Sequence, residues 1–233
     1  MYVFKVLALL FCAVPLLAAS KFPTYLQKCK NDEHLNACFL KSARAGIVNI
    51  LKGDPQLGIP QYKPLKVPYQ IVLETKDLKL VIDNLKVVAP VVINDAKWDT
   101  DKRNISMKVD FTKIIWDYTG KLDGKFLDQN VNASGNFTHI YENGWGTHNL
   151  LYDIVEIDGE KYGSINGGTS SYTSGKITCM FENINDDMQQ LINKNWEKFD
   201  GLFHKDIEVL ITRLISGPFK AIFKVTPIDQ LFE

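Results

Sequence analysis

The sequence predicts an α+β protein: a long C-terminal α-helix wrapped by a strongly curved antiparallel β-sheet, in one elongated domain with an internal hydrophobic tunnel. Three observations lead to this fold class. Residues 184–215 place apolar side chains at helical spacing, residues 67–181 are dominated by β-branched runs, and no segment of crossover-helix length interrupts those runs. Strands that follow one another without crossover helices form an antiparallel sheet.

The first twenty residues form a candidate signal peptide. Lys5 supplies a positive charge, residues 6–17 are almost continuously apolar, and residues 18–20 are the small side chains that signal peptidase requires. The apolar stretch is shorter than the roughly 20 residues that span a bilayer. We therefore expect a secreted, extracellular protein with a mature chain of residues 21–233 and no stable membrane insertion. A signal anchor is the alternative.

Residues 32–52 predict an amphipathic helix near the start of the mature chain. Asn31 and Asp32 are candidate N-caps, because their short side chains accept hydrogen bonds from free backbone N–H groups. Gly53 and Pro55 end the helix. Apolar side chains recur in it at intervals of three or four residues: Leu35, Phe39, Ala43, Ile47 and Leu51.

Three of the four cysteines, Cys29, Cys38 and Cys179, remain in the mature chain, since Cys12 lies in the signal segment. In an oxidising compartment we expect a Cys29–Cys38 disulfide, because these cysteines are close in sequence and flank the start of the helix. Cys179 is expected to be a buried thiol, with a reactive thiol as the alternative. The sequence contains no Cys/His spacing typical of a metal site, so no metal and no cofactor are expected.

An irregular connector, punctuated by prolines between residues 55 and 68, leads into the strand-rich part of the chain. Candidate strands cover residues 71–73, 78–82, 85–88, 91–93, 105–111 and 114–118. Glycine-containing turns are expected at residues 118–120, 122–124, 158–159 and 166–168.

The apolar stripe of residues 184–215 predicts one helix of roughly 48 Å, at ~1.5 Å per residue. Gly217-Pro218 is expected to end or kink it, and Phe219, Ile222 and Phe223 indicate one or two further turns. The stripe is too wide and too aromatic for a coiled-coil seam, so it needs a broad apolar partner such as a curved sheet.

Side chains alone fill the inside of a sheet rolled around so long a helix with difficulty, so we expect an apolar tunnel beside the helix. The candidate lining residues are Trp196, Phe199, Phe203 and Leu210. Ordinary core packing of these side chains is the alternative.

Three sequons provide candidate N-glycosylation sites at Asn104, Asn132 and Asn136. Turn-forming residues surround each of them, as an exposed acceptor loop requires. We expect at least one of the three to carry a glycan.

The chain has 27 basic and 27 acidic residues, so its formal net charge is zero. Neutrality leaves no basic footprint for nucleic acid and no polybasic patch for anionic membranes. A Gly-x-Ser-x-Gly nucleophile elbow is missing from the sequence, which favours a non-enzymatic protein. A hydrolytic triad that uses His139 or His148 is the weaker alternative.

Several motifs follow one another along the mature chain. They are the cysteine pair of Cys29-Lys-Asn-Asp-Glu-His-Leu-Asn-Ala-Cys38, the segment Gly58-Ile-Pro-Gln-Tyr-Lys-Pro-Leu-Lys-Val-Pro68, the strand segment Leu85-Lys-Val-Val88, the central Tyr118-Thr-Gly-Lys-Leu122 and Ala133-Ser-Gly-Asn-Phe137, and the ending Val225-Thr-Pro-Ile-Asp-Gln-Leu-Phe232. In this order and at these spacings they resemble the insect takeout and haemolymph juvenile-hormone-binding protein family over essentially the whole mature chain.

The resemblance implies an extracellular insect protein with a lipophilic tunnel between a long helix and a curved sheet. It implies carriage of an apolar ligand: a juvenile-hormone-like terpenoid, a fatty acid or another lipid. Haemolymph hormone binders of this family carry a second disulfide, whereas Cys179 has no fourth cysteine to pair with. This departure favours the takeout-like side of the family.

We therefore expect a secreted, monomeric carrier of a small hydrophobic ligand. Three alternatives remain open: a membrane-interacting lipid-transfer protein, a secreted esterase, and a signalling protein that binds no ligand.

Overall fold

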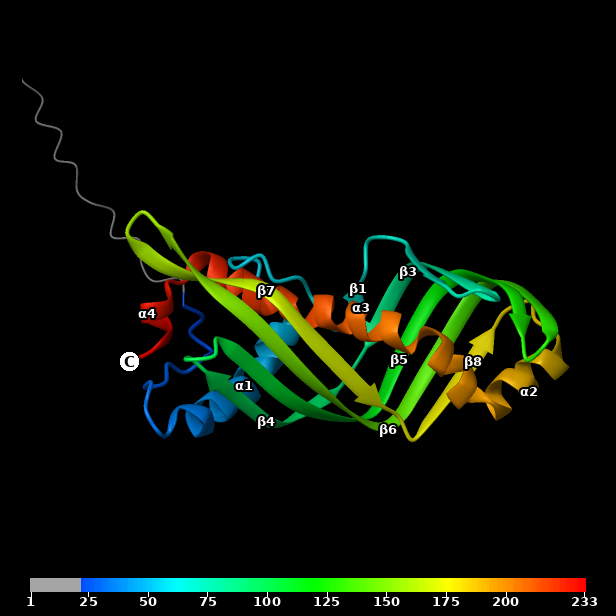
Figure 1. Ribbon diagram of the computed structural model, residues 1–233, viewed down its shortest axis with the longest axis horizontal. Helices are drawn as coiled ribbons and strands as arrows, with labels where there is room; N and C mark the ends of the chain where they lie inside the picture. The colour runs from blue at the N-terminus through cyan, green and yellow to red at the C-terminus, as the bar shows by residue number, and fades with distance from the viewer. Residues whose placement is uncertain (1–21) are drawn as a thin grey trace, which may run out of the picture.

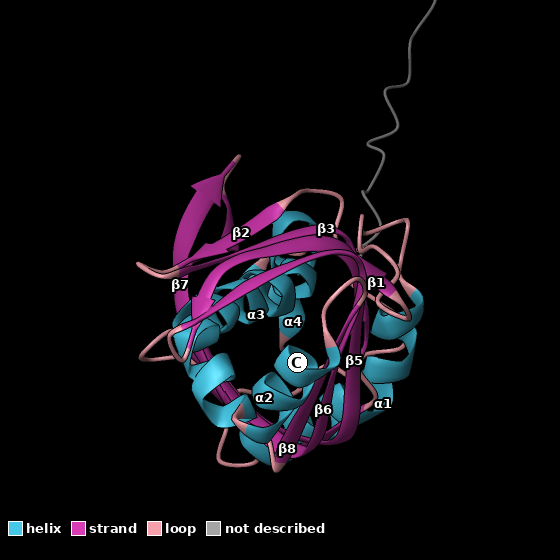
Figure 2. Cartoon of the chain, turned by 90° about the vertical axis from the view of Figure 1, so that its right-hand side faces the viewer, coloured by secondary structure: helices cyan, strands magenta, loops and turns pink. Residues whose placement is uncertain are grey.

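One antiparallel sheet follows the long helix α3 (Trp196–Val225) along the length of the molecule (Figure 1). This computed structural model describes residues 22–233, so the expected signal peptide lies outside the described residues. Seen end on, the sheet curls around α3 without closing on itself (Figure 2). The predicted fold class of a helix wrapped by a curved antiparallel sheet is therefore confirmed.

Two long strands form the spine of the sheet: β5 (Asn104–Phe126) and β6 (Gln129–Ile157). They pair in antiparallel register over their whole shared length, from Phe126 opposite Gln129 to Asn104 opposite Leu151. The tight turn between them places Leu127 and Asp128 at φ of 49° and 63°, the left-handed conformation that two-residue hairpin turns need.

Shorter strands extend this spine at both ends. The remaining strands are β1 (Leu65–Lys66), β2 (Ile71–Glu74), β3 (Leu78–Val88), β4 (Val91–Asp99), β7 (Glu160–Thr173) and β8 (Lys176–Phe181). Strands β3 and β4 pair with opposite ends of β5, whereas β8 pairs with residues 137–142 of β6 and β7 pairs with its second half. Different strands therefore pair with different parts of the spine, and together they carry the sheet along the helix.

Three of the four expected glycine turns are wrong. Residues 118–120 and 122–124 lie inside β5, residues 166–168 lie inside β7, and only residues 158–159 join two strands. Gly120 shows the reason, since a Cβ at that position would lie 2.7 Å from the Val81 carbonyl oxygen. Glycine there permits close approach of neighbouring backbones within the sheet rather than a reversal of the chain.

The N-terminal helix α1 (Leu35–Lys52) packs on β4 and begins later than the sequence predicts. Neither Asn31 nor Asp32 is its N-cap. The Asp32 side chain accepts a hydrogen bond from the His34 backbone N–H at 2.8 Å, and its carbonyl accepts one from Leu35. These bonds form a turn before the helix, because a short aspartate side chain readily bonds the backbone two residues further on.

The predicted single helix over residues 184–215 is interrupted at Asn195, which separates α2 (Asp186–Lys194) from α3. The interruption lets α2 lie against strand β8. From α2, Asn193 accepts a hydrogen bond from the Cys179 N–H at 2.7 Å and donates to the Cys179 carbonyl at 2.9 Å, while Gln189 accepts one from the Phe181 N–H. Side-chain amides thus satisfy an otherwise open sheet edge.

Gly217-Pro218 does not end the helix, because α3 continues through Pro218 to Val225, and the further turns expected at Phe219, Ile222 and Phe223 are present. Proline has no N–H to donate to the carbonyl of Leu214, four residues earlier. The hydroxyl of Tyr62 donates to that carbonyl instead, at 3.1 Å. Gly217 leaves room for it, since a Cβ there would lie 2.7 Å from the Tyr62 hydroxyl.

Two clusters of buried apolar side chains divide the interior along α3. The larger cluster lies where β3, β5, β6 and β8 curl around α2 and the first half of α3. The smaller cluster gathers the second half of α3, the short helix α4 (Ile228–Leu231), and parts of β5 and β6, with half-buried residues of α1 packed against it. Within residues 22–233, no helix is long and apolar enough to cross a membrane.

Candidate functional site

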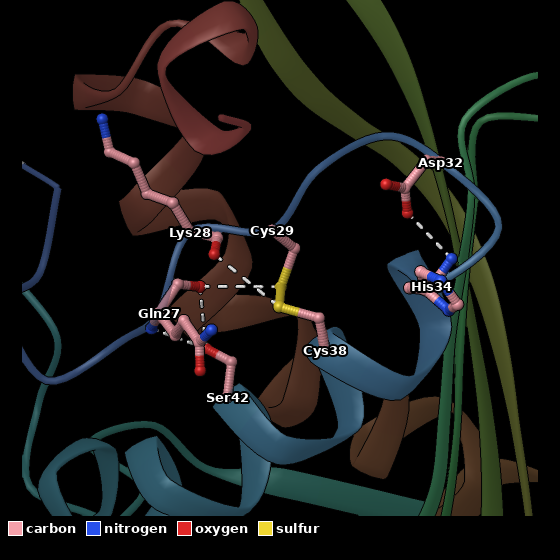
Figure 3. Close-up of a disulfide and its surroundings, with 7 residues drawn as sticks. All are labelled: Gln27, Lys28, Cys29, Asp32, His34, Cys38 and Ser42. Carbon is pink, nitrogen blue, oxygen red and sulfur yellow. Dashed lines mark hydrogen bonds between the residues drawn. A yellow bond between two sulfur atoms is a disulfide. The ribbon is translucent and has the colours of Figure 1, made fainter.

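The expected disulfide joins Cys29 to Cys38, with their Cα atoms 5.7 Å apart (Figure 3). It links the N-terminal segment to the first turn of α1. The C-terminal end of the chain lies beside it, because Cys29 forms a parallel bridge with Phe232 and its carbonyl accepts a hydrogen bond from the Glu233 N–H at 3.1 Å. Both ends of the described chain therefore meet at one end of the molecule.

A cavity of about 90 Å³ opens beneath this disulfide. Its walls come from the N-terminal segment, α1, β4, the last turns of α3 and the C-terminal end, and its lining side chains are mostly aromatic or aliphatic: Phe22, Leu26, Leu35, Phe39, Trp98, Phe219, Ile222, Phe223, Leu231 and Phe232. Ser42 also borders it, but its hydroxyl both accepts from the Gln27 N–H and donates to the Gln27 carbonyl. The cavity, which we call the disulfide-end cavity, is therefore apolar.

Trp98 on β4 holds the aromatic wall of this cavity together. Its ring lies 5.3 Å from Phe39, 5.9 Å from Phe223 and 5.1 Å from Phe232, between ring centroids. Its indole N–H donates to the hydroxyl of Tyr152 at 2.9 Å, so this polar group does not face the cavity unpaired. Aromatic rings at such separations attract one another beyond simple burial.

A second, smaller cavity of about 20 Å³ lies beside the first half of α3, and we call it the sheet cavity. Most of its lining is apolar: Leu73, Leu80, Ile82, Trp116, Ile177, Phe199, Phe203 and Ile207. Its other lining side chains are His139, Tyr141, Cys179 and Asp200. It shares no lining residue with the disulfide-end cavity.

Burial sets the protonation states of His139 and Cys179, which border the sheet cavity. The Nε2 atom of His139 lies 3.1 Å from the Tyr118 hydroxyl oxygen. Burial lowers the pKa of the His139 imidazole to about 3. Burial, with a smaller contribution from the Asp200 carboxylate, raises the pKa of the Cys179 thiol well above its ordinary value. At neutral pH the imidazole is therefore uncharged and the thiol is protonated.

The four lining residues expected from the sequence fall in different surroundings. Phe199 and Phe203 border the sheet cavity. Trp196 is half-buried and packs against the larger core cluster, and Leu210 is buried within that cluster. None of the four borders the disulfide-end cavity.

Sequence reasoning missed the residues that line the disulfide-end cavity. Phe219, Ile222 and Phe223 continue the helical spacing past Pro218, which is a signal for helix but not for a cavity. Trp98 carries no local signal at all, because its role depends on rings contributed by α1, α3 and the C-terminal end.

The sequons do not lie in turns, as the sequence analysis expected. Asn104 is the first residue of β5 and is partly buried, whereas Asn132 and Asn136 are exposed residues within β6. Asn132 donates to Asp123 on the neighbouring strand at 2.9 Å. The turn-forming residues around them serve the strand pairing of β5 and β6 instead.

His148, the other triad candidate, belongs to a buried chain of hydroxyl groups. Its Nδ1 lies 2.9 Å from the Ser170 Oγ, and Thr212 on α3 donates to that Oγ at 2.8 Å. Burial lowers the pKa of His148 to about 4. Among residues 22–233 no carboxylate hydrogen-bonds either His148 or His139, so neither is oriented as a general base.

The curled sheet and the helix that it encloses define a helix-in-sheet fold with two apolar cavities. A family model described as haemolymph juvenile hormone binding protein matches residues 6–233. The chain belongs to this family, and the resemblance found in its motifs is confirmed. Its members are secreted binding proteins for hydrophobic ligands, not enzymes.

Among solved structures, the crystal structure of Epiphyas postvittana Takeout 1 is similar with a TM-score of 0.78 at 18 % sequence identity. The match covers 88 % of this chain and 98 % of that one, and it shows a shared fold. The crystal structure of a lipopolysaccharide binding protein matches with a TM-score of 0.42 at 14 % identity, over 77 % of this chain and 38 % of that one. No curated protein sequence matches this chain.

Proposed function

We propose that this protein is a secreted carrier that binds a small hydrophobic ligand, such as a terpenoid or another lipid, in its apolar interior. One observation carries the proposal: the disulfide-end cavity is lined almost wholly by aromatic and aliphatic side chains, and the Ser42 hydroxyl that borders it is already paired with the Gln27 backbone. Empty apolar space of this kind favours apolar guests over water.

The ligand enlarges the cavity as it binds. Ligand pockets commonly measure 300–1,000 Å³, roughly several times the volume of about 90 Å³ present here. The walls can separate, because they come from segments held to one another by a few polar contacts. Between α1 and β4 these include the Arg44 side chain with the Ile93 carbonyl at 2.7 Å and the Asn36 side chain with the Trp98 N–H at 2.8 Å.

A tunnel along α3 completes the proposal. In it, Trp196, Phe199, Phe203 and Leu210 line the part of the tunnel beside the first half of α3, and the tunnel continues from there toward the disulfide-end cavity. A ligand that buries ~400 Å² of apolar surface gains about 10 kcal/mol before association costs, at ~25 cal/mol per Å². After those costs the affinity falls in the micromolar to nanomolar range that suits a carrier.

Displacement of the fluorescent probe N-phenyl-1-naphthylamine from the secreted protein tests the proposal. We expect terpenoid and fatty-alcohol ligands to displace the probe, and organic extraction of protein from its native source to recover a long apolar compound. Ile222→Trp fills the disulfide-end cavity and should weaken binding at least tenfold. Val209→Trp, at an exposed position on the same helix, is the matched control and should bind normally.

Failure of the whole ligand panel to bind would overturn the carrier proposal. Sedimentation of the protein with liposomes at physiological salt would instead support a membrane-interacting lipid-transfer protein. Esterase activity that disappears on replacement of His139 and His148 would support the hydrolase.

Secretion, glycosylation and oligomeric state belong to the same proposal. We expect the secreted chain to begin at Lys21, to lose mass on treatment with a glycosidase if Asn104, Asn132 or Asn136 is occupied, and to elute as a monomer. N-terminal sequencing, mass spectrometry and light scattering measure these three properties.

A further inference from the structure

We propose that the sheet cavity is a subsite for an uncharged oxygen-bearing group of the ligand, such as a hydroxyl or ketone, with the Tyr141 hydroxyl as its hydrogen-bond donor. This inference rests on the proposed carrier function and narrows its ligand class. It separates neutral oxygenated ligands from ionised fatty acids.

Tyr141 is the buried tyrosine of the sheet cavity whose hydroxyl has no partner. Its side chain is only 4 % exposed and its ring packs between Trp116 and Tyr172, at centroid distances of 5.6 and 6.1 Å. Two neighbouring buried tyrosines are satisfied: Tyr118 bonds His139, and Tyr172 donates to Asp200 at 2.7 Å. Within residues 22–233, no hydrogen bond engages the Tyr141 hydroxyl. A buried hydroxyl without a partner calls for an explanation, because such groups are rare.

Tyr141 borders the sheet cavity, and its free hydroxyl is not fully enclosed by protein atoms. Fully enclosed polar side-chain atoms without a partner, within the described residues, belong to Asn104, Thr226 and Gln230. The Tyr141 oxygen is not among them, so it keeps accessible surface, and the space that Tyr141 borders is the sheet cavity. That space of about 20 Å³ accommodates an atom or two of a ligand, such as one oxygen and its carbon.

The charges around the cavity exclude an anionic group. Its lining contains the Asp200 carboxylate but no lysine or arginine. His139 supplies no cation, because burial keeps its imidazole neutral at physiological pH. A ligand carboxylate in the cavity would lie next to another carboxylate with no positive partner, which buried charges do not tolerate.

Hydrogen bonds already hold Asp200 in place. Its two oxygens accept from the Tyr172 hydroxyl at 2.7 Å and meet the Nδ1 of His204 at 2.9 Å. Both partners lie outside the lining of the cavity. The Tyr141 hydroxyl is the O–H donor of the lining, and it remains free for a neutral ligand oxygen. The N–H and S–H groups of the lining belong to Trp116, His139 and Cys179.

The apolar tail of the ligand lies along α3. Phe199, Phe203 and Ile207 form the helical wall of the sheet cavity at successive turns. Their spacing of four residues keeps them on one helix face, which continues toward the disulfide-end cavity. The proposed ligand is thus a long apolar chain with its oxygen at the sheet end.

A matched set of twelve-carbon ligands tests the inference at pH 8: dodecane, 1-dodecanol, 2-dodecanone and dodecanoate. We expect the alcohol and the ketone to bind the wild-type protein roughly tenfold more tightly than dodecane, which is the contribution of one buried hydrogen bond. Tyr141→Phe should abolish that preference and leave the affinities for dodecane and dodecanoate unchanged. Tyr69→Phe, at an exposed position, is the matched control and should keep the preference.

The outcomes separate this inference from the carrier function. If none of the four ligands binds, the carrier proposal itself fails. If all four bind equally, or if dodecanoate binds most tightly and loses affinity in Tyr141→Phe, the carrier proposal stands and the subsite is wrong.

A second measurement does not depend on the variant folding. A dodecanol that carries a diazirine at the second carbon, photolysed with the wild-type protein, should label peptides containing residues 139–141, 177–179 or 199–203. Labelling confined to residues 218–232 would overturn the subsite.

Discussion

The two ends of α3 lie in interiors that are built differently. At the sheet end, continuous strands of 23 and 29 residues curl around the helix, and the space left over is about 20 Å³. At the disulfide end, the walls are pieces of the N-terminal segment, α1, β4 and the C-terminal end, and the cavity measures about 90 Å³. A continuous sheet can pack to normal interior density, whereas walls assembled from separate segments leave apolar gaps.

The smaller cavity, at the sheet end, has more polar side chains in its lining than the larger cavity. At the larger cavity the Ser42 hydroxyl is already paired with the Gln27 backbone, while the smaller cavity is bordered by His139, Tyr141, Cys179 and Asp200. A ligand that spans both would therefore meet apolar surroundings in the roomy end and hydrogen-bonding groups in the tight end. The larger volume and the larger number of hydrogen-bonding side chains therefore lie in different halves of the molecule.

Among the variants proposed here, Phe203→Ala should lower stability most, and it tests whether the two ends of α3 are packed differently. Phe203 is 2 % exposed and packs against Phe199 at 5.8 Å, so its truncation should cost about 3–5 kcal/mol of unfolding free energy. Phe219→Ala, in the half-buried wall of the disulfide-end cavity, should cost under about 2 kcal/mol because the site is already loosely filled. Urea denaturation of both variants measures the difference. Equal losses would show that the two ends are packed alike.

The double variant Cys29→Ser/Cys38→Ser tests the disulfide end alone. Loss of a bridge with a sequence separation of 9 should lower stability by about 2–3 kcal/mol, through the entropy of the unfolded chain. Amide hydrogen exchange should accelerate in α1, while β5 and β6 keep their protection. Acceleration spread evenly over the sheet would contradict the separation of the two halves.

Acid should lower the stability of the fold through its buried histidines, and His148 is the one that tests this. The folded-state pKa of His148 is about 4, below the value of about 6.5 in an unfolded chain. The unfolded chain therefore binds the proton first, and stability that is present above pH 6.5 is lost as the pH falls toward 4. Between pH 7 and pH 5 this loss amounts to about 2 kcal/mol for His148.

His148→Gln should remove this part of the pH dependence, and His34→Gln, at an exposed position, should leave it intact. Denaturation curves at the two pH values provide the measurement. An unchanged pH dependence in His148→Gln would show that its imidazole titrates alike in the folded and unfolded states.

Tyr62→Phe is the smallest and most local change. It removes the hydroxyl that bonds the Leu214 carbonyl left free by Pro218, so we expect a loss of about 1 kcal/mol. Hydrogen exchange should accelerate around residues 214–222 and not in the first half of α3. A stability equal to wild type would mean that water satisfies this carbonyl as well as tyrosine does.

The local sequence pattern was sufficient to predict most of the helices and strands. Helical spacing identified α1 and the greater part of α2 and α3, and β-branched runs identified the strands, because these periodicities follow from backbone geometry alone. The turns were less predictable. Gly120 and Gly168 resemble turn residues in sequence, yet they serve close contacts between paired strands.

By itself, the sequence determined the family, the antiparallel class of the sheet, the disulfide and the apolar face of the final helix. Only the tertiary structure decided where that helix breaks, where it continues, and where the cavities lie. The break at Asn195 depends on the open edge of β8, and the passage through Pro218 depends on Tyr62, which is far away in sequence. The cavities depend on walls from segments distant in the chain, and no local pattern records the space left between them.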